Sequence, residues 1–423
     1  MDDLEAYDPV VITGVGMVTP FAGDREQTWQ AVLNGQSAAR PLSLLDLRGH
    51  SHTTHNQFSR WIGCPADRSL TLADDPLVDL ALRSSREAIH DAELTDAAVE
   101  PARLGCVFGT SKGSLFAATE LWSQHSKDPS FALRTLLGPA VSAQAIAAER
   151  RLSGPVLCPV AACATGVAAA LRGAELIRQG DCDAVIAGSA DDSLHPLVLA
   201  SFQRLGILAP PEHPETASRP FDRRRRGFVV GAGAGCLILE RRSHAQRRGK
   251  QWYAVVGPGR LQSDPTGITS LDTSGSVLAH MIKSCWKSFD PSAATVPDVV
   301  NLHGTGTRQN DPAECRALQL VFGDRLASVS CGSLKGGLGH LLGAAGSVEL
   351  GLCCLMLRDQ IVPATVNLND VDDDCRLSWV RNQPVRRSIE SLLKISLGFG
   401  GQQAVLLLRR GPLQGHAPER PTA

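Results

Sequence analysis

Short apolar runs that end near a glycine alternate along the chain with longer amphipathic stretches. Residues 10–17 (VVITGVGM) and 104–109 (LGCVFG) have the length and apolar content of buried strands, whereas 24–34 and 76–92 carry apolar side chains at helical spacing. Residues 228–240 (FVVGAGAGCLILE) predict a hairpin. Strands that alternate with helices indicate an α/β architecture with a mainly parallel sheet.

A similar series of elements begins after the basic stretch 241–250. Five further strands are predicted, at 252–257, 299–303, 328–332, 394–397 and 404–408. Cys163 and His340 are both followed by two residues, a glycine and small apolar residues, which favours equivalent turns in two duplicated halves. We therefore predict an N-terminal half at 1–250 that carries Cys163, a C-terminal half at 251–411 and a flexible tail at 412–423.

Composition narrows the function classes. The 423 residues carry a formal net charge of −1 and only 4% aromatic residues, which argues against a nucleic-acid or anionic-membrane surface. No stretch offers the roughly 20 apolar residues of a membrane span, and the acidic N-terminus is unlike a signal peptide, so we expect a cytoplasmic protein. Twelve cysteines form no zinc-type spacing, and the loop histidines His50, His52 and His55 are expected to be solvated, so no metal site is predicted.

The stretch 154–180 (GPVLCPVAACATGVAAALRGAELIRQG) is the centre of the predicted chemistry. An apolar run leads to Cys163, and the Ala-rich residues after it predict a helix that ends near Gly180. A thiol at a helix start is biased toward the thiolate. This effect is worth only about 0.3–1 kcal/mol, so another group must help to activate the sulfur.

Three segments of the second half add side chains suited to catalysis. The segment NLHGTGTRQNDPAE places His303 at a strand end and predicts Asp311 as a helix cap, with Glu314 three residues later. The segment GSLKGGLGHLLGAAGSVE carries Lys335 in a glycine-rich loop and His340 at a predicted helix start. The segment SLGFGGQQA sets Phe399 between glycines in a turn.

Together these motifs resemble the β-ketoacyl-acyl carrier protein synthases, in particular the elongating type that uses one cysteine and two histidines. The resemblance runs along nearly the whole chain and is carried by VVITGVGMVTPF at 10–21, ACATG at 162–166, HGTGT at 303–307, LKGGLGHLLGAAG at 334–346 and GFGG at 398–401. It implies a thiolase-like fold, in which two duplicated βαβαβ halves form a five-layered αβαβα unit.

The resemblance also implies roles for individual residues. Cys163 would accept the acyl group, and His303 and His340 would bind the malonyl thioester carbonyl. Lys335 would support the loop together with Glu349, and the backbone N–H groups of Cys163 and Phe399 would form the oxyanion hole beneath a gate made by Phe399. The residues implied to contact substrate are Thr305, Thr307, Phe108 and Phe202.

Two departures from the family pattern carry hypotheses of their own. Phe108 stands where an aliphatic residue often lines the acyl pocket, which predicts short primers; the alternative is ordinary packing at a subunit interface. The run of four arginines at 223–226 predicts docking of an acidic carrier protein, or it is a solvated loop. The docking candidates are Arg68, Lys127, Arg204, Arg224 and Arg226.

The expected reaction joins the acyl group on Cys163 to malonyl-acyl carrier protein, with release of CO2, in fatty acid or polyketide synthesis. The expected partners are the loaded carrier proteins and a second subunit, in a homodimer or in a heterodimer with a related chain. No cofactor is expected, since phosphopantetheine arrives with the carrier protein. The main alternative is a non-condensing partner subunit that sets chain length; a thiolase and a Cys/His hydrolase are further alternatives.

Overall fold

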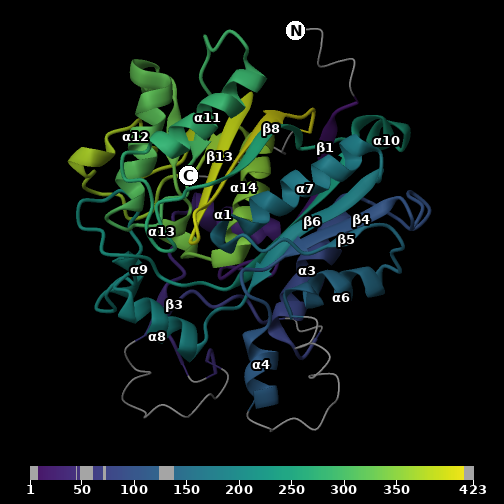
Figure 1. The fold of residues 1–423 in the computed structure, drawn as a ribbon, viewed down its shortest axis with the longest axis horizontal. Coiled ribbons are helices and arrows are strands. Elements are labelled where there is room, and N and C mark those ends of the chain that lie inside the picture. The colour runs from purple at the N-terminus through teal and green to yellow at the C-terminus, as the bar shows by residue number, and fades with distance from the viewer. Residues whose placement is uncertain (1–7, 44, 48–60, 70–72, 123–137, 414–423) are drawn as a thin grey trace, which may run out of the picture.

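The computed structural model describes residues 8–43, 45–47, 61–69, 73–122 and 138–413. Ten strands of these residues form one mixed sheet (Figure 1). Its strands span Val10–Val18 (β1), Leu104–Gly109 (β4), Val156–Leu157 (β5), Ala184–Asp191 (β6), Gly233–Arg241 (β7), Ala254–Ser263 (β8), Val299–Asn301 (β9), Ser330–Gly332 (β10), Ser391–Gly398 (β13) and Gln402–Arg410 (β14).

The order of the strands is β10-β9-β13-β14-β8-β1-β7-β6-β4-β5. The four pairings toward the two edges are parallel, and the five central ones are antiparallel. The prediction of a mainly parallel sheet is therefore wrong. Apolar runs of this kind identify buried strands, but their direction depends on pairings between distant segments.

The strand order repeats about the centre of the sheet. From the centre outward, one set reads β1, β7, β6, β4 and β5, and the other reads β8, β14, β13, β9 and β10, with the same succession of antiparallel and parallel pairings. The first strand of each set lies at the centre, where Val11 pairs with Val255. Two copies of one topology are thus joined edge to edge.

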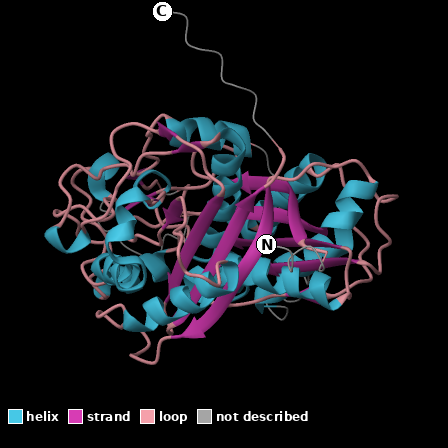
Figure 2. Cartoon of the chain, turned by 90° about the horizontal axis from the view of Figure 1, so that it is seen from above, coloured by secondary structure: helices cyan, strands magenta, loops and turns pink. Residues whose placement is uncertain are grey.

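Helices cover both faces of each set. Helices α3 (Pro76–Asp91) and α6 (Val141–Glu149) pack on the outer face of the first set, and α11 (Ser276–Phe289) and α12 (Asn310–Phe322) lie on the outer side of the second. Helices α7 (Thr165–Gln179) and α14 (Ala345–Asp359) pack against each other between the two sets. Figure 2 shows the strands running through the middle of the molecule with helices around them. The arrangement is the five-layered αβαβα unit that was expected.

The remaining elements are short or lie at the periphery. They are α1 (Arg25–Leu33), β2 (Arg40–Pro41), β3 (Ile62–Gly63), α4 (Leu115–Trp122), α8 (Pro196–Arg204), α9 (Pro214–Ala217), α10 (Arg242–Arg247), α13 (Lys335–Leu338), β11 (Ile361–Val362) and β12 (Val385–Arg386). Within the described ranges, no helix combines the length and apolar character needed to cross a bilayer. His50, His52, His55, Lys127 and residues 414–423 lie outside the described residues.

The central helices start side by side, and this contact corrects the predicted repeat. A Cβ added to Gly166 would lie 2.1 Å from the amide nitrogen of Ser347, so the two helix starts touch through backbone. Each helix follows a three-residue 3₁₀ turn, Ala162–Ala164 or Leu342–Ala344, that opens with a residue of positive φ. Cys163 is therefore equivalent to Gly343 and not to His340, which lies two residues before its turn.

The predicted hairpin at 228–240 is also wrong. Only its second part forms a strand, β7, which runs between β1 and β6. The residues before β7 make isolated bridges instead, and one of them joins Val230 to His340. A run of alternating glycine and apolar residues is compatible with a hairpin and with an irregular segment that leads into one strand. The contact with the His340 segment favours the irregular segment.

Candidate active site

Cys163, His303 and His340 come together from three separate segments. Their donor atoms, the Cys163 Sγ and one ring nitrogen of each imidazole, all lie within 4.8 Å of one another. Cys163 is in the 3₁₀ turn before α7, His303 follows β9, and His340 lies between α13 and the second 3₁₀ turn. All three line a cavity of about 680 Å³, as do four residues implied by the resemblance: Phe202, Thr305, Thr307 and Phe399.

Carboxylates of α12 hold the loop that carries His303. Glu314 accepts hydrogen bonds from the backbone N–H groups of His303 at 2.6 Å and Gly304 at 2.7 Å, and Asp311 accepts one from Gly306 at 3.1 Å. The predicted capping box is wrong, because α12 begins at Asn310 and Asp311 lies inside its first turn. The carboxylates of Asp311 and Glu314 accept hydrogen bonds from the buried N–H groups of the His303 loop instead of capping the helix.

Both imidazoles are neutral. Burial, together with the positive charges of Lys335 and Lys394, holds the pKa values of His303 and His340 well below the ordinary value for histidine. His340 Nδ1 accepts a hydrogen bond from the N–H of Leu342 at 3.3 Å, so its proton is on Nε2. We expected the position of His340 at a helix start to disfavour its imidazolium form, but burial is the larger cause of its lowered pKa.

The Cys163 side chain is partly buried, and the loss of water around its thiol governs its pKa. This loss raises the pKa of the thiol to about 12, against the opposing effects of Lys112 and Lys335. The thiol is therefore protonated at rest, and the expected bias toward thiolate is outweighed. The turn itself is fixed by Thr165, whose Oγ1 accepts from the N–H of Ala161 at 2.9 Å and donates to the carbonyl of Ala162 at 2.7 Å.

Lys335 and Glu349 form the predicted support. Lys335 Nζ donates to the His303 carbonyl and to Glu349 Oε1, each at 2.6 Å. A second lysine, Lys394, lies 2.6 Å from Glu349 Oε2 and was missed by the sequence analysis. The available signal was a lysine in the middle of the apolar strand SLLKISLG.

Aromatic rings line the cavity between Phe399 and His340. Phe399 is 38% exposed in the turn after β13, and its ring centroid lies 6.4 Å from that of Phe202. The ring of Phe228 lies 5.6 Å from Phe202 and 5.0 Å from His340, in edge-to-face arrangements. The sequence analysis missed Phe228, which is separated from both partners along the chain.

Phe108 lies outside the cavity. Its ring is fully buried in the cluster between the sheet and helices α3 and α6, and the position of a Cβ at Gly188 would be 2.7 Å from it. The neighbouring residue Val107 faces the opposite side, toward α7. In the single chain, Phe108 therefore packs in the core and does not line the cavity that holds Cys163, and its effect on primer length stays a prediction.

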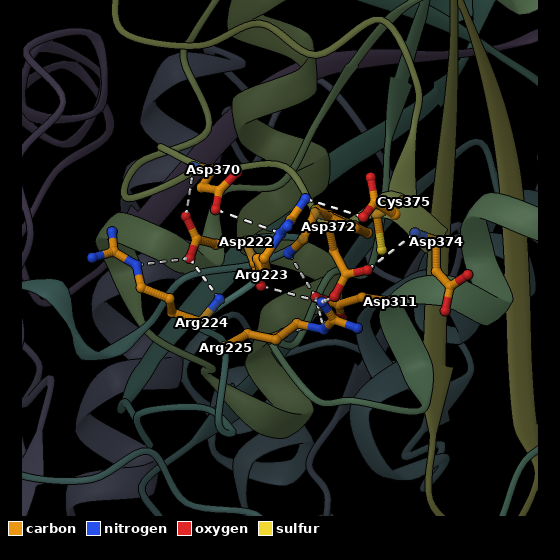
Figure 3. Close-up of polar contacts among 12 residues, drawn as sticks. Asp222, Arg223, Arg224, Arg225, Asp311, Asp370, Asp372, Asp374 and Cys375 are labelled. Carbon is orange, nitrogen blue, oxygen red and sulfur yellow. Dashed lines mark hydrogen bonds and ion pairs between the residues drawn. The ribbon is translucent and has the colours of Figure 1, made fainter.

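The four arginines at 223–226 face different surroundings, and Figure 3 shows the first three. Arg225 is buried, with Nη1 2.5 Å from Asp372 and Nε 3.8 Å from Asp311. Arg223 pairs with aspartates of the segment 370–373, and Arg224 lies 3.6 Å from Asp222 with 62% of its side chain exposed.

Arg226, the last of the run, is exposed and lines the cavity. Two further docking candidates are also exposed: Arg204 at the end of α8, and Arg68, which donates to the Leu45 carbonyl at 3.2 Å. Among the docking candidates that the structure describes, Arg226 is thus the one that lines the cavity of Cys163, His303 and His340.

Thiolate and imidazole are also zinc ligands. Among the described residues, Cys163, His303 and His340 are the group whose donor atoms are close enough to hold such an ion. Binding would require loss of the thiol proton, which the raised pKa of Cys163 opposes.

Two family models match the chain. The N-terminal domain model of β-ketoacyl synthases covers residues 7–245, and the C-terminal domain model covers 253–369. The chain belongs to the β-ketoacyl synthase family. It is therefore an acyl-transferring condensing enzyme, as the motifs around Cys163, His303 and His340 predicted.

Relatives of this β-ketoacyl synthase include both polyketide and fatty acid enzymes. The ketoacyl synthase alpha subunit of the tetracenomycin polyketide synthase from Streptomyces glaucescens is 33% identical, over 95% of this chain and 97% of its own. The 3-oxoacyl-[acyl-carrier-protein] synthase 2 of Coxiella burnetii is 32% identical, over 95% and 98%.

Solved structures agree with the fold. A type II polyketide synthase acyl-carrier protein in complex with its ketosynthase bound to the hexaketide superposes with a TM-score of 0.85, at 27% identity, over 96% of this chain and 99% of that one. A β-ketoacyl synthase from Burkholderia phymatum gives 0.84 at 28% identity, over 95% and 99%.

Proposed function

We propose that the protein joins an acyl group, held as a thioester on Cys163, to the malonyl group of malonyl-acyl carrier protein. The products are CO2 and a β-ketoacyl-carrier protein, in fatty acid or polyketide synthesis. The observation that carries this proposal is the convergence of one thiol and two neutral imidazoles within 4.8 Å in a single cavity.

In the first half-reaction, the sulfur of Cys163 attacks the thioester of the acyl-carrier protein. The new C–S bond replaces the bond to pantetheine, and the thiol proton goes to the departing pantetheine sulfur. The negative charge on the carbonyl oxygen would be met by the N–H groups of Cys163 and Phe399. Glycine at 398 keeps this place open, because a Cβ there would lie 2.9 Å from the Cys163 amide nitrogen.

In the second half-reaction, the malonyl carboxylate leaves as CO2 and its electron pair forms an enolate. His340 can donate its Nε2 proton in a hydrogen bond to that oxygen, and His303 would act beside it. Neutral imidazoles are suited to this task, because each can donate an N–H hydrogen bond without bringing a net charge of its own. The enolate carbon then attacks the acyl carbonyl, and the bond to Cys163 breaks. The sulfur leaves as a thiolate and takes up a proton from solvent.

The pantetheine arm would enter along the polar wall of the cavity. Thr305 and Thr307 lie there with their hydroxyl oxygens 3.0 Å apart, and the exposed side chains of Arg226 and Arg308 line the same cavity. Arginines can bind the phosphate of phosphopantetheine. The similarity to a ketosynthase solved with its acyl-carrier protein supports such a protein as partner.

Other parts of this proposal rest on the sequence and the family. We propose a dimer, formed with a second copy or with a related subunit, and a cytoplasmic location. Phosphopantetheine would be supplied by the carrier protein, and no metal or further cofactor would take part. The presence of Cys163 favours the condensing role over that of a subunit that only sets chain length.

Intact-protein mass spectrometry tests the proposal. The protein is incubated with a panel of acyl-carrier proteins and should gain one acyl group, which Cys163→Ala abolishes. Addition of malonyl-carrier protein should then remove this group and yield a β-ketoacyl product. His340→Ala should still be acylated but should not release CO2 from the malonyl substrate. Acylation of Cys163→Ala, or no β-ketoacyl product from any primer, would contradict the proposal.

A further inference from the structure

Glu349 is shared by two buried lysines. Its Oε1 lies 2.6 Å from Lys335 Nζ and its Oε2 lies 2.6 Å from Lys394 Nζ. The three side chains are 3%, 1% and 0% exposed, respectively, and they come from α14, α13 and β13. One lysine would suffice to neutralise the carboxylate. The second leaves the cluster with a net positive charge in a place that water does not reach.

An uncompensated buried charge is costly, by several kcal/mol in proteins after relaxation. A buried cluster that keeps an extra positive charge therefore suggests that this charge has a function. The contact of Lys394 with Glu349 Oε2 is an ion pair, and its hydrogen bond goes to the carbonyl of Ile395 at 2.6 Å, on the strand that leads to Phe399. In the parallel pairing of β13 with β9, Lys394 is opposite Asn301, two residues before His303. The charge thus lies where the gate and the His303 loop meet.

Further charged groups lie near the imidazoles, and most of them form ion pairs with a neighbouring group of opposite charge. Lys112 lies 3.5 Å from Asp191, and Asp311 is paired with the buried Arg225. The other groups in these surroundings are the Cys163 thiol and the carboxylate of Glu314, which accepts three N–H hydrogen bonds and whose pKa burial raises to about 7. The Lys335–Glu349–Lys394 cluster therefore has one lysine more than it has carboxylates. Glu314, which also acts on Lys335, offsets this extra positive charge only in part at neutral pH.

We propose that Lys394 is a positioning residue that acts through this cluster, by adding a positive charge that stabilises the enolate and keeps His303 and His340 neutral. This inference rests on the proposed function. The charge takes no part in bond making. It favours the enolate, in which the negative charge of the malonyl carboxylate has moved to the thioester oxygen beside the imidazoles. It also disfavours imidazolium, which would replace the neutral donors. The lowered pKa values of both histidines agree with this direction.

The test compares Lys394→Met, Lys394→Arg and the control Lys283→Met, which removes an exposed lysine of α11. Lys394→Met leaves a balanced Lys335–Glu349 pair, so the thermal unfolding midpoint should not fall. We expect kcat for malonyl decarboxylation to fall about tenfold or more with KM nearly unchanged. The acid limb of the kcat profile should move up by about 1 pH unit, as expected when a nearby buried charge is removed. Lys394→Arg should restore most of the activity.

A second measurement needs no substrate. In a titration of ¹³C-labelled histidine by NMR, the pKa values of His303 and His340 should rise in Lys394→Met and not in Lys283→Met. Unchanged histidine titration, or decarboxylation within about twofold of wild type, overturns the role of Lys394. An equal loss of activity at every pH, together with a lower thermal unfolding midpoint, also overturns this role, because it indicates a structural defect. A wild-type protein that does not decarboxylate malonyl-carrier protein would refute the proposed function, and the NMR titration would still decide the effect of Lys394.

Discussion

Gly398→Ala tests the oxyanion hole with a single methyl group. The position of the added Cβ lies 2.9 Å from the amide nitrogen of Cys163, 3.0 Å from the carbonyl of Ala161 and 3.1 Å from the Cβ of Ala162. The nearest contact is with backbone, which cannot rotate away as a flexible side chain can. The methyl group should therefore displace the N–H of Cys163 or shield it from the substrate oxygen.

The magnitude follows from the loss of one donor. Removing one donor of an oxyanion hole typically costs about 10²–10³ in kcat, or about 2.7–4 kcal/mol. We therefore expect about a 10²-fold fall in the rate at which Cys163 is acylated, with little change in KM. The assay is time-resolved intact-protein mass spectrometry with an acyl-carrier protein, together with alkylation of Cys163 by iodoacetamide, which needs no oxyanion hole and should change little.

Gly267→Ala is the matched control. Gly267 lies in the loop after β8, and a Cβ there would approach no atom outside its immediate neighbours more closely than 3.4 Å, an ordinary contact. This variant should acylate at the wild-type rate. If Gly398→Ala also acylates within about threefold of wild type, the N–H of Cys163 contributes no donor to the reaction and the reasoning is refuted.

Three further predictions concern buried charges and the arginine run. The carboxylate of Glu240 raises the pKa of His244 in the folded protein. The His244–Glu240 pair therefore contributes its full stabilisation of the fold below the unfolded-state pKa of about 6.5 and loses it as pH rises through the folded-state pKa. His244→Gln should therefore lower the free energy of unfolding by about 1.5–3 kcal/mol in urea at pH 6, and by less at pH 9. Arg225→Met, which leaves Asp311 buried without its ion pair, should cost about 3–5 kcal/mol in urea unfolding. Arg226→Ala should leave stability unchanged and raise KM for the acyl-carrier protein in steady-state assays, and an unchanged KM would remove its proposed docking role.

The sequence identifies the candidate catalytic side chains more completely than it identifies the side chains that hold them in place. Cys163, His303 and His340 stand in short motifs whose glycines and small residues mark tight turns, so they could be singled out locally as candidates, and the family resemblance implied their roles. Their convergence could only be inferred from the family resemblance, because it depends on two halves of the chain packing through α7 and α14. The register of the repeat was misjudged for the same reason, since only the contact of the helix starts shows that Cys163 matches Gly343.

Long-range partners explain most of what the sequence analysis missed. Lys394 is an isolated lysine in an apolar strand until Glu349, on another element, comes within 2.6 Å. Arg225 looks like its neighbours in the run until the aspartates Asp311 and Asp372 bury it. A pattern of residue types shows where charge is present. It does not show which charges are compensated, and that depends on packing between distant segments.

The state of the thiol connects these observations. A helix start can contribute about 0.3–1 kcal/mol toward a thiolate, less than one pKa unit, whereas burial raises the pKa of Cys163 to about 12. The resting site therefore holds a protonated sulfur and two neutral imidazoles above a cluster of net positive charge. Such a site gains little by binding the neutral acyl thioester. It gains most when the oxyanion forms, and when decarboxylation moves the negative charge of the malonyl group to the enolate oxygen beside the imidazoles. Differential stabilisation of this kind raises kcat rather than affinity, and so the supporting charges should affect turnover more than KM.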